Sequence, residues 1–102
     1  MFYHVVYFWL INDLTAEQRT DFLRGLRTLP SVATIQRAHI GVPAATDREV
    51  IDSSYSYALI CEFVDKAAQD TYLNHPIHLQ FVQDCAQYWT RVQVYDSEAI
   101  LL

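Results

Sequence analysis

The first residues of the chain, 2–11, constrain the fold more than any other segment. Most of them are aromatic or β-branched, which predicts a β-strand. Side chains alternate between the two faces of a strand. One face would carry Phe2, His4, Val6, Phe8 and Leu10, and the other Tyr3, Val5, Tyr7 and Trp9. Both faces are largely apolar, so the sequence predicts a strand that is covered on both sides.

A helix is predicted after the turn at residues 12–13. Thr15 and Gln18 have the spacing of a capping box, in which side chains satisfy the free amide groups at a helix start. The apolar residues that follow have helical spacing and share one face: Phe22, Leu23, Leu26 and Leu29. Pro30 is expected to end the helix.

Two further strands are predicted at residues 32–42 and 55–64, with a polar, exposed loop at 43–54 between them. In the second of these strands the alternating residues Tyr57, Leu59, Cys61 and Phe63 share one face. A short helix over residues 65–73 follows, with one stripe formed by Val64, Ala67, Ala68, Thr71 and Tyr72.

The segment Asn74-His75-Pro76 interrupts that helix. A residue before proline avoids the helical region, so His75 marks a break, and Pro76 suits the first position of a new helix. We expect this helix to run to about residue 90. One face of it would carry His78, Phe81, Val82, Cys85 and Trp89. The last strand is expected at residues 92–96.

This order of elements predicts a single α+β domain over residues 1–102, of βαββαβ type. Right-handed crossovers would place all helices on one side of a four-stranded antiparallel sheet. The other side would then be bare, with Tyr3, Val5, Tyr7 and Trp9 on it.

Several hundred Å² of apolar surface would be exposed on this bare face, which is as large as the biggest patch of a typical monomer, about 300–600 Å². The sequence therefore predicts a homodimer joined through the sheet face. The apolar tail, residues 99–102, could lie across the partner. The alternative is a monomer whose sheet aromatics are partly exposed.

The net charge of −5 and the seven scattered Lys and Arg residues argue against nucleic acid and against an anionic membrane surface as partners.

Cys61 and Cys85 lie in apolar segments and form no CxxC pair, so we expect buried free thiols. The chain has no basic, signal-like start and no apolar run of about 18 residues, which favours the cytoplasm.

His4, Tyr72 and His78 are the candidate chemical groups, because each lies on an apolar face. In one continuous helix Tyr72 and His78 would be about 240° apart and could not meet. The break at His75 makes a meeting possible. A histidine beside a tyrosine suits acid–base chemistry near neutral pH; the alternative is a hydrogen-bonded histidine of the core.

No metal site or cofactor is predicted. His75 and His78 are three residues apart, but a zinc site needs three or four ligands and no others are placed. The chain has only two glycines, Gly25 and Gly41, and neither belongs to a phosphate-binding loop. No GxSxG motif is present.

Three segments resemble the stress-responsive A/B barrel (Dabb) family: His4-Val5-Val6-Tyr7-Phe8, then Tyr72-Leu73-Asn74-His75-Pro76-Ile77-His78, then Tyr88-Trp89. The resemblance runs along almost the whole chain and is least certain at residues 43–54. It implies a ferredoxin-like fold and a dimeric α/β barrel, in which two sheets face each other.

The resemblance is also to a plant polyketide cyclase of this family, the enzyme that makes olivetolic acid, in which a histidine and a tyrosine catalyse an aldol-type ring closure without a cofactor. The matching catalytic positions are His78 and Tyr72, and His4 matches a polar pocket residue. Leu26 stands where the cyclase has a pocket tyrosine, so substrate and reaction could differ. The apolar pocket lining implied by the resemblance consists of Val6, Phe8, Phe22, Leu59, Phe81, Trp89, Val92 and Val94.

These observations favour a cofactor-independent acid–base enzyme that acts on a hydrophobic carbonyl compound, in a pocket between sheet and helices. The first alternative is a non-catalytic dimeric stress-responsive or ligand-binding protein. A cofactor-free monooxygenase is a remote third possibility, because its only support is the shared architecture.

Overall fold

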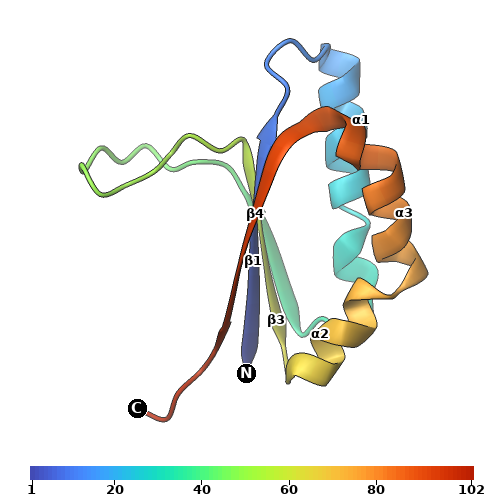
Figure 1. The fold of residues 1–102 in the computed structure, drawn as a ribbon, viewed down its shortest axis with the longest axis vertical. Coiled ribbons are helices and arrows are strands. Elements are labelled where there is room, and N and C mark those ends of the chain that lie inside the picture. Colours follow the sequence, from blue (N-terminus) through green and yellow to red (C-terminus); the bar gives the residue numbers. More distant parts are fainter.

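The computed structural model describes residues 1–102 and shows one four-stranded antiparallel sheet with all helices on one of its faces (Figure 1). The chain order is β1 (Phe2–Leu10), α1 (Ala16–Leu26), η1 (Leu29–Ser31), β2 (Arg37–Gly41), β3 (Tyr57–Phe63), α2 (Lys66–Leu73), α3 (Pro76–Cys85), η2 (Ala86–Tyr88) and β4 (Trp89–Glu98). The strand order in the sheet is β2-β3-β1-β4. The predicted βαββαβ arrangement is therefore confirmed.

The alternation predicted for the first strand is confirmed. Along β1 every second residue, from Phe2 to Leu10, is buried, and the residues between them are only partly buried. β1 lies between β3 and β4, so both of its edges are paired. The helices cover its buried face, and the other face, which we call the open face, has no helix over it (Figure 1).

Side chains cap the starts of all three α-helices, and the capping box expected at the first of them is present. Thr15 and Gln18 form both hydrogen bonds of a capping box at the start of α1. The Asp65 carboxylate accepts a hydrogen bond from the amide of Ala68 at the start of α2. His75 has an extended backbone and accepts a bond from the amide of Ile77, so the predicted break between α2 and α3 is confirmed.

Several predicted boundaries are wrong. α1 ends at Leu26, and Pro30 lies in the separate 3-10 helix η1, whose first turn needs no amide hydrogen at that position. The strand predicted at 32–42 is only β2, because residues 32–36 form a turn, in which the amide of Ile35 donates to the carbonyl of Val32. The helix predicted to reach residue 90 ends at Cys85, and Trp89 begins β4 instead of lying on that helix.

The predicted stripe of α2 is also partly wrong. Val64, Ala67 and Thr71 are exposed, whereas Gln69 and Tyr72 are the residues that α2 buries. Gln69 is buried because its side chain reaches the imidazole of a buried histidine on β1. The buried face of α2 therefore includes a polar residue, Gln69, and a search for regularly spaced apolar residues does not find it.

The core lies between the sheet and the helices and includes both cysteines, which are buried and free as predicted. Residues 42–56 between β2 and β3 form an extended arm on the open-face side of the sheet, and the tail after β4 leaves on that same side (Figure 1). None of the helices has the length and apolar character needed to cross a membrane.

Candidate active site

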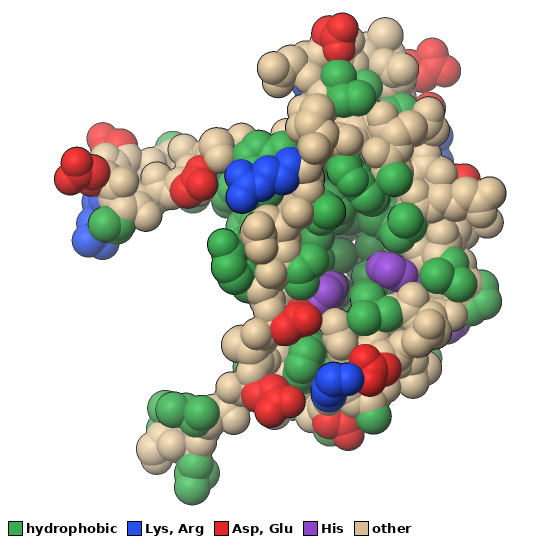
Figure 2. Space-filling view, viewed as in Figure 1, with side chains coloured by type: hydrophobic (Ala, Val, Ile, Leu, Met, Phe, Trp, Pro, Cys, Tyr) green, Lys and Arg blue, Asp and Glu red, His purple; other side chains and the backbone are tan.

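A cavity of about 310 Å³ lies between the sheet and the helices, beside the edge strand β4. Its lining is mostly apolar and comes from β1, β3, β4, α2, α3 and η1. Figure 2 shows a hollow there, with histidine side chains among hydrophobic ones. The lining residues are His4, Val6, Phe8, Leu29, Leu59, Tyr72, Leu73, His78, Phe81, Val82, Trp89, Val92 and Val94.

The cavity brings together every site residue expected from the sequence except Phe22 and Leu26. Both of these are fully buried on α1 and lie in the core outside the cavity. Phe22 packs against Phe8, with ring centroids 5.4 Å apart, and Phe8 in turn lines the cavity. The lining also includes Leu29, Leu73 and Val82, which were not expected.

The pairing of β1 with β4 explains how β4 contributes to the cavity. Val6 pairs with Val94 and Phe8 with Val92, and paired residues project to the same face of a sheet. The register shifts between Trp9 and Leu10, so that Trp89 pairs with Leu10. The indole of Trp89 then lies 5.3 Å from the Phe8 ring, centroid to centroid, on the helix side.

Tyr72 and His78 meet in the cavity, with ring centroids 4.9 Å apart. The break at His75 makes this possible, because it changes the direction of the chain between α2 and α3. The Nδ1 of His78 lies 2.9 Å from the carbonyl oxygen of Leu73, the last residue of α2. A carbonyl only accepts, so Nδ1 carries the hydrogen, and Nε2 is the basic nitrogen of the neutral ring.

Burial lowers the pKa of His78 below its usual 6.5, since the surroundings solvate the charged form poorly. The bond to the Leu73 carbonyl acts in the opposite direction, and the nearby His4 lowers the pKa further. His78 is therefore a neutral base at pH 7. Its Nε2 has no partner in the protein and is free to accept a proton from a bound molecule.

The Tyr72 hydroxyl also lacks a protein partner. Among buried side-chain nitrogen and oxygen atoms, only the Thr34 hydroxyl is both sealed from solvent and unbonded. The Tyr72 oxygen must therefore reach the open volume of the cavity that its side chain lines. Burial, and to a lesser extent Cys61, raises the pKa of Tyr72 above its usual value, so the hydroxyl remains a hydrogen donor.

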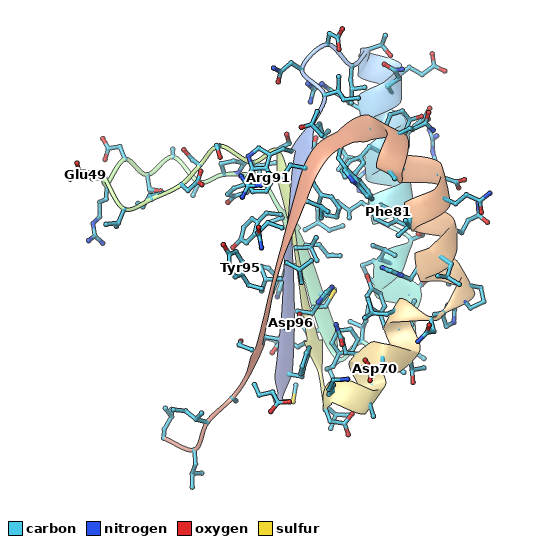
Figure 3. The ribbon with its side chains drawn as sticks, viewed as in Figure 1. Glu49, Asp70, Phe81, Arg91, Tyr95 and Asp96 are labelled. Carbon is cyan, nitrogen blue, oxygen red and sulfur yellow. The ribbon has the colours of Figure 1, made fainter.

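His4 lies beside Tyr72, with ring centroids 6.1 Å apart, and is 5% exposed. Its Nδ1 lies 2.6 Å from the carboxylate of Asp96, its pairing partner on β4. A carboxylate accepts, so Nδ1 carries the hydrogen and Nε2 is left without a protein partner. Figure 3 labels Asp96 on the last strand, β4.

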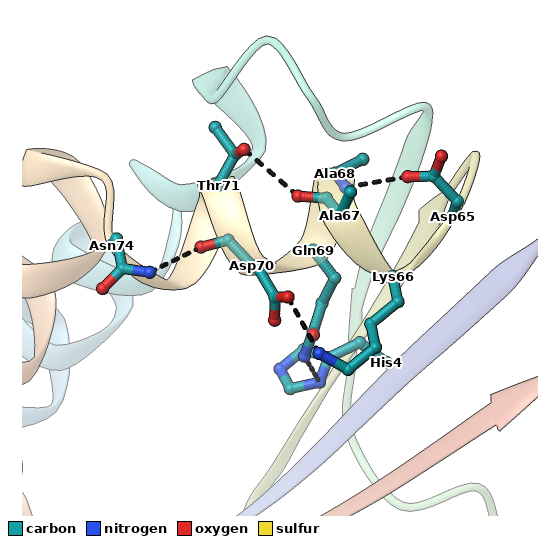
Figure 4. A network of polar contacts seen from close by, with 9 residues as sticks. All are labelled: His4, Asp65, Lys66, Ala67, Ala68, Gln69, Asp70, Thr71 and Asn74. Carbon is teal, nitrogen blue, oxygen red and sulfur yellow. Dashed lines mark hydrogen bonds and ion pairs between the residues drawn. The ribbon is translucent and has the colours of Figure 1, made fainter.

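Gln69 extends from α2 to the same imidazole, and its amide lies 3.2 Å from Nδ1 of His4 (Figure 4). Nδ1 has one hydrogen, and Asp96 at the shorter distance receives it. The Gln69 amide approaches the same nitrogen and packs against the ring there. Three groups that can donate or accept protons, from His4, Tyr72 and His78, thus line one apolar cavity.

Sequence reasoning missed both residues that hold His4, although signals existed. Asp96 follows Val92 and Val94 at alternate positions in the predicted last strand, which places all three on one face. Gln69 precedes Tyr72 by three residues on the predicted helix, which places them on one side. Neither pattern predicts a contact with His4, because that contact depends on the pairing of β1 with β4 and on the packing of α2 against the sheet.

No three histidine, cysteine or acidic side chains lie close enough together to hold a metal ion. His75, which is three residues before His78, binds the amide of Ile77 through its Nδ1 and serves as the cap of α3.

A family model described as the stress responsive A/B barrel domain (Dabb) matches residues 2–99 of the chain. No curated protein sequence is significantly similar to it. Among solved structures, a protein from Arabidopsis thaliana is similar with a TM-score of 0.81 and 19% identity, over 100% of this chain and 98% of that one.

A Dabb family protein with a ferredoxin-like fold from Mesorhizobium loti is similar with a TM-score of 0.78 and 23% identity, over 97% of this chain and 96% of that chain. A protein from Thermobifida fusca, described as dimeric and ferredoxin-like, has a TM-score of 0.77 and 16% identity, over 96% and 90% of the two chains. The similar structures also include a hydroxynitrile lyase from Passiflora edulis and an antibiotic biosynthesis monooxygenase, at 18% and 16% identity. At these identities the likeness establishes a ferredoxin-like fold.

Proposed function

This chain belongs to the stress responsive A/B barrel (Dabb) family, and on that premise we propose that it is a cofactor-independent acid–base enzyme. It acts on a hydrophobic small molecule that contains a carbonyl group, in the cavity between sheet and helices. One observation carries the proposal: His78, with an unpaired basic nitrogen, and Tyr72, with an unpaired hydroxyl, line one apolar cavity with their ring centroids 4.9 Å apart.

The proposed reaction begins with removal of a proton from the carbon next to the carbonyl. Nε2 of His78 takes the proton, and the electrons of the broken C–H bond form the carbon–carbon double bond of an enolate. The carbonyl oxygen then carries the negative charge, and the Tyr72 hydroxyl donates a hydrogen bond to it. A positioned base contributes about 10²–10⁴-fold and one oxyanion donor about 10²–10³-fold.

The surroundings of both residues suit these roles. His78 must be neutral to accept a proton, and burial keeps its pKa below 6.5. Tyr72 must keep its proton to stabilise the enolate, and burial raises its pKa. His4, held by Asp96 at 2.6 Å, orients a second polar group of the substrate through Nε2. The enolate carbon then attacks an electrophile or recovers a proton, as the substrate dictates.

We also propose that the protein is a homodimer joined through the open face, with Tyr3, Val5, Tyr7 and Trp9 at the interface. On β1 these residues remain only partly buried. Further apolar surface lies on neighbouring strands of the sheet, at Ile60 and Tyr95. Proteins of the same fold from Thermobifida fusca and Bacteroides fragilis are described as dimeric.

Proton abstraction can be tested without knowledge of the natural product. Hydrophobic ketones and β-diketones are incubated with the protein in D₂O, and exchange of the proton next to the carbonyl is followed by NMR. We expect His78→Ala to slow catalysed exchange by about 100-fold or more, and Tyr72→Phe by at least tenfold.

His39→Ala and Tyr88→Phe are the matched controls, because both residues lie outside the cavity. Wild-type rates in His78→Ala and Tyr72→Phe would contradict the proposed roles. Thermal stabilisation by these compounds, without exchange or turnover, would instead favour the non-catalytic ligand-binding alternative, for which the largely apolar lining is the supporting observation.

A further inference from the structure

The C-terminal tail of the chain contains three consecutive apolar residues that are largely exposed in their own subunit. Ile100, Leu101 and Leu102 are 81%, 99% and 115% exposed relative to a reference residue. The tail is attached to the rest of the molecule just after β4, where the amide of Ala99 donates to the carbonyl of Met1 at 3.0 Å. Beyond that bond, three large apolar side chains stand in solvent, which is costly unless another surface covers them.

A groove of about 290 Å³ with aromatic walls lies on the open face at the base of the arm. Its walls are in contact with one another: the Tyr55 ring packs on Tyr7 with centroids 4.8 Å apart, and the Trp9 indole donates to the Ser54 hydroxyl at 3.0 Å. The Arg91 guanidinium lies 4.2 Å from the centre of the Trp9 ring. We call this site the aromatic groove; it is lined by Tyr7, Trp9, Asp52, Tyr55, Arg91, Gln93 and Tyr95.

The tail and the aromatic groove lie at opposite ends of the open face. The pairing of Phe2 with Glu98 places the start of the tail at one end of the sheet, and the pairing of Trp9 with Arg91 places the groove at the other. The tail and the arm both project to the open-face side, as Figures 1 and 3 show, with Arg91 and Tyr95 near the base of the arm.

Two-fold symmetry then relates the two features. If the axis runs between the facing sheets and across the strands, the tail end of each subunit lies over the groove end of its partner. Packed sheets are separated by about 10 Å. Four extended residues span about 13 Å, so the tail is long enough to cross this gap. An axis parallel to the strands would place tail against tail and would leave both grooves open.

We propose that the tail of each subunit docks in the aromatic groove of its partner, so that two reciprocal contacts close the dimer. This inference rests on the proposed homodimer. Apolar tail residues and aromatic groove walls are complementary, and neither finds a partner within one chain. The two contacts are equivalent by symmetry, so each dimer buries both tails and fills both grooves.

The first test measures the dimer dissociation constant by sedimentation on dilution. Burial of one leucine side chain shifts a binding constant by about tenfold to 100-fold. Since each dimer contains two tails, Leu101→Asp is expected to raise the dissociation constant by about 100-fold or more. Leu79→Asp is the matched control, because Leu79 is exposed on α3, on the helix side of the sheet. It should leave the constant unchanged.

The second test is disulfide trapping. Leu101→Cys combined with Asp52→Cys should form a covalent dimer on oxidation, whereas Leu101→Cys alone should not. Within one chain these positions are at opposite ends of the sheet, so a bond between them must join two subunits. The native cysteines are buried and do not compete.

A covalent dimer of the Leu101→Cys single variant would show tail against tail and would overturn the proposal. An unchanged dissociation constant for Leu101→Asp would also overturn it, while the dimer through the open face would stand. A wild-type protein that is monomeric at micromolar concentration would refute the homodimer itself.

Discussion

Gly25→Ala tests the close contact between α1 and α3, the helix that carries His78. A Cβ atom on Gly25 would lie 2.5 Å from Sγ of Cys85 and 3.5 Å from the Phe81 ring. The first distance is far below van der Waals contact. Cys85 is 2% exposed and has a single side-chain torsion, so few positions are open to the sulfur. The added methyl group must therefore separate the two helices or displace Sγ.

The magnitude follows from two opposing terms. Overpacking of a core costs about 1–3 kcal/mol of unfolding free energy. Replacement of glycine by alanine inside a helix gains about 1 kcal/mol. We expect Gly25→Ala to lower the unfolding free energy by about 1 kcal/mol in the wild-type background, a fall of several degrees in Tm. In a Cys85→Ala background the sulfur is absent, and the same change should stabilise the protein by up to about 1 kcal/mol.

Urea unfolding of the four proteins in this double-mutant cycle provides the assay. The coupling energy between the two positions should be about 1–3 kcal/mol. Its sign should show that Gly25→Ala is less destabilising when the sulfur of Cys85 has been removed. Equal stabilisation by Gly25→Ala in both backgrounds would refute the reasoning, because it would mean that α1 and α3 are not held at this contact. Because Phe81 lines the cavity, Gly25→Ala should also weaken ligand binding there.

Three further predictions concern the site and the core. The exchange rate catalysed through His78 should fall with decreasing pH, with a midpoint below 6.5, because burial lowers its pKa and only the neutral ring accepts a proton; a midpoint above 6.5 in a pH–rate profile would contradict this. The thiols of Cys61 and Cys85, whose pKa values burial raises to about 12 and about 11, should not react with a thiol reagent at pH 8 until the protein unfolds; rapid labelling of native protein would show that they are accessible. Asp65→Ala should cost about 1 kcal/mol in thermal unfolding, since it removes the side chain that caps α2, whereas Asp65→Asn should keep most of that stability.

Local chemistry explains why much of the fold was predictable. A capping box, a proline that follows a break between two helices and a strand with strict alternation each act within a few residues, and all three are present where expected. Boundaries that depend on distant contacts were not predictable. Trp89 continues an apolar helical pattern, yet it forms the start of β4 because pairing with β1 satisfies its backbone and its indole packs on Phe8.

The candidate site shows the same division. The sequence placed His4, Tyr72 and His78 on apolar faces, and the break at His75 left room for a meeting of the last two. It did not show that Asp96 and Gln69 hold the imidazole of His4, because those contacts join residues 92 and 65 positions apart in the chain. The sequence also did not distinguish residues that line the cavity from residues of the core such as Phe22 and Leu26, which are fully buried.

The sequence by itself determined the kinds of element, their order and the presence of apolar side chains on both faces of β1, since these follow from local propensity and from the periods of helix and strand. The tertiary structure decided which polar groups face one another, because strand register and the angle between α2 and α3 set those distances. His78 acquires its neutral form and its fixed hydrogen from burial and from the carbonyl of Leu73. Both are properties of packing between segments, which no local pattern of residues encodes.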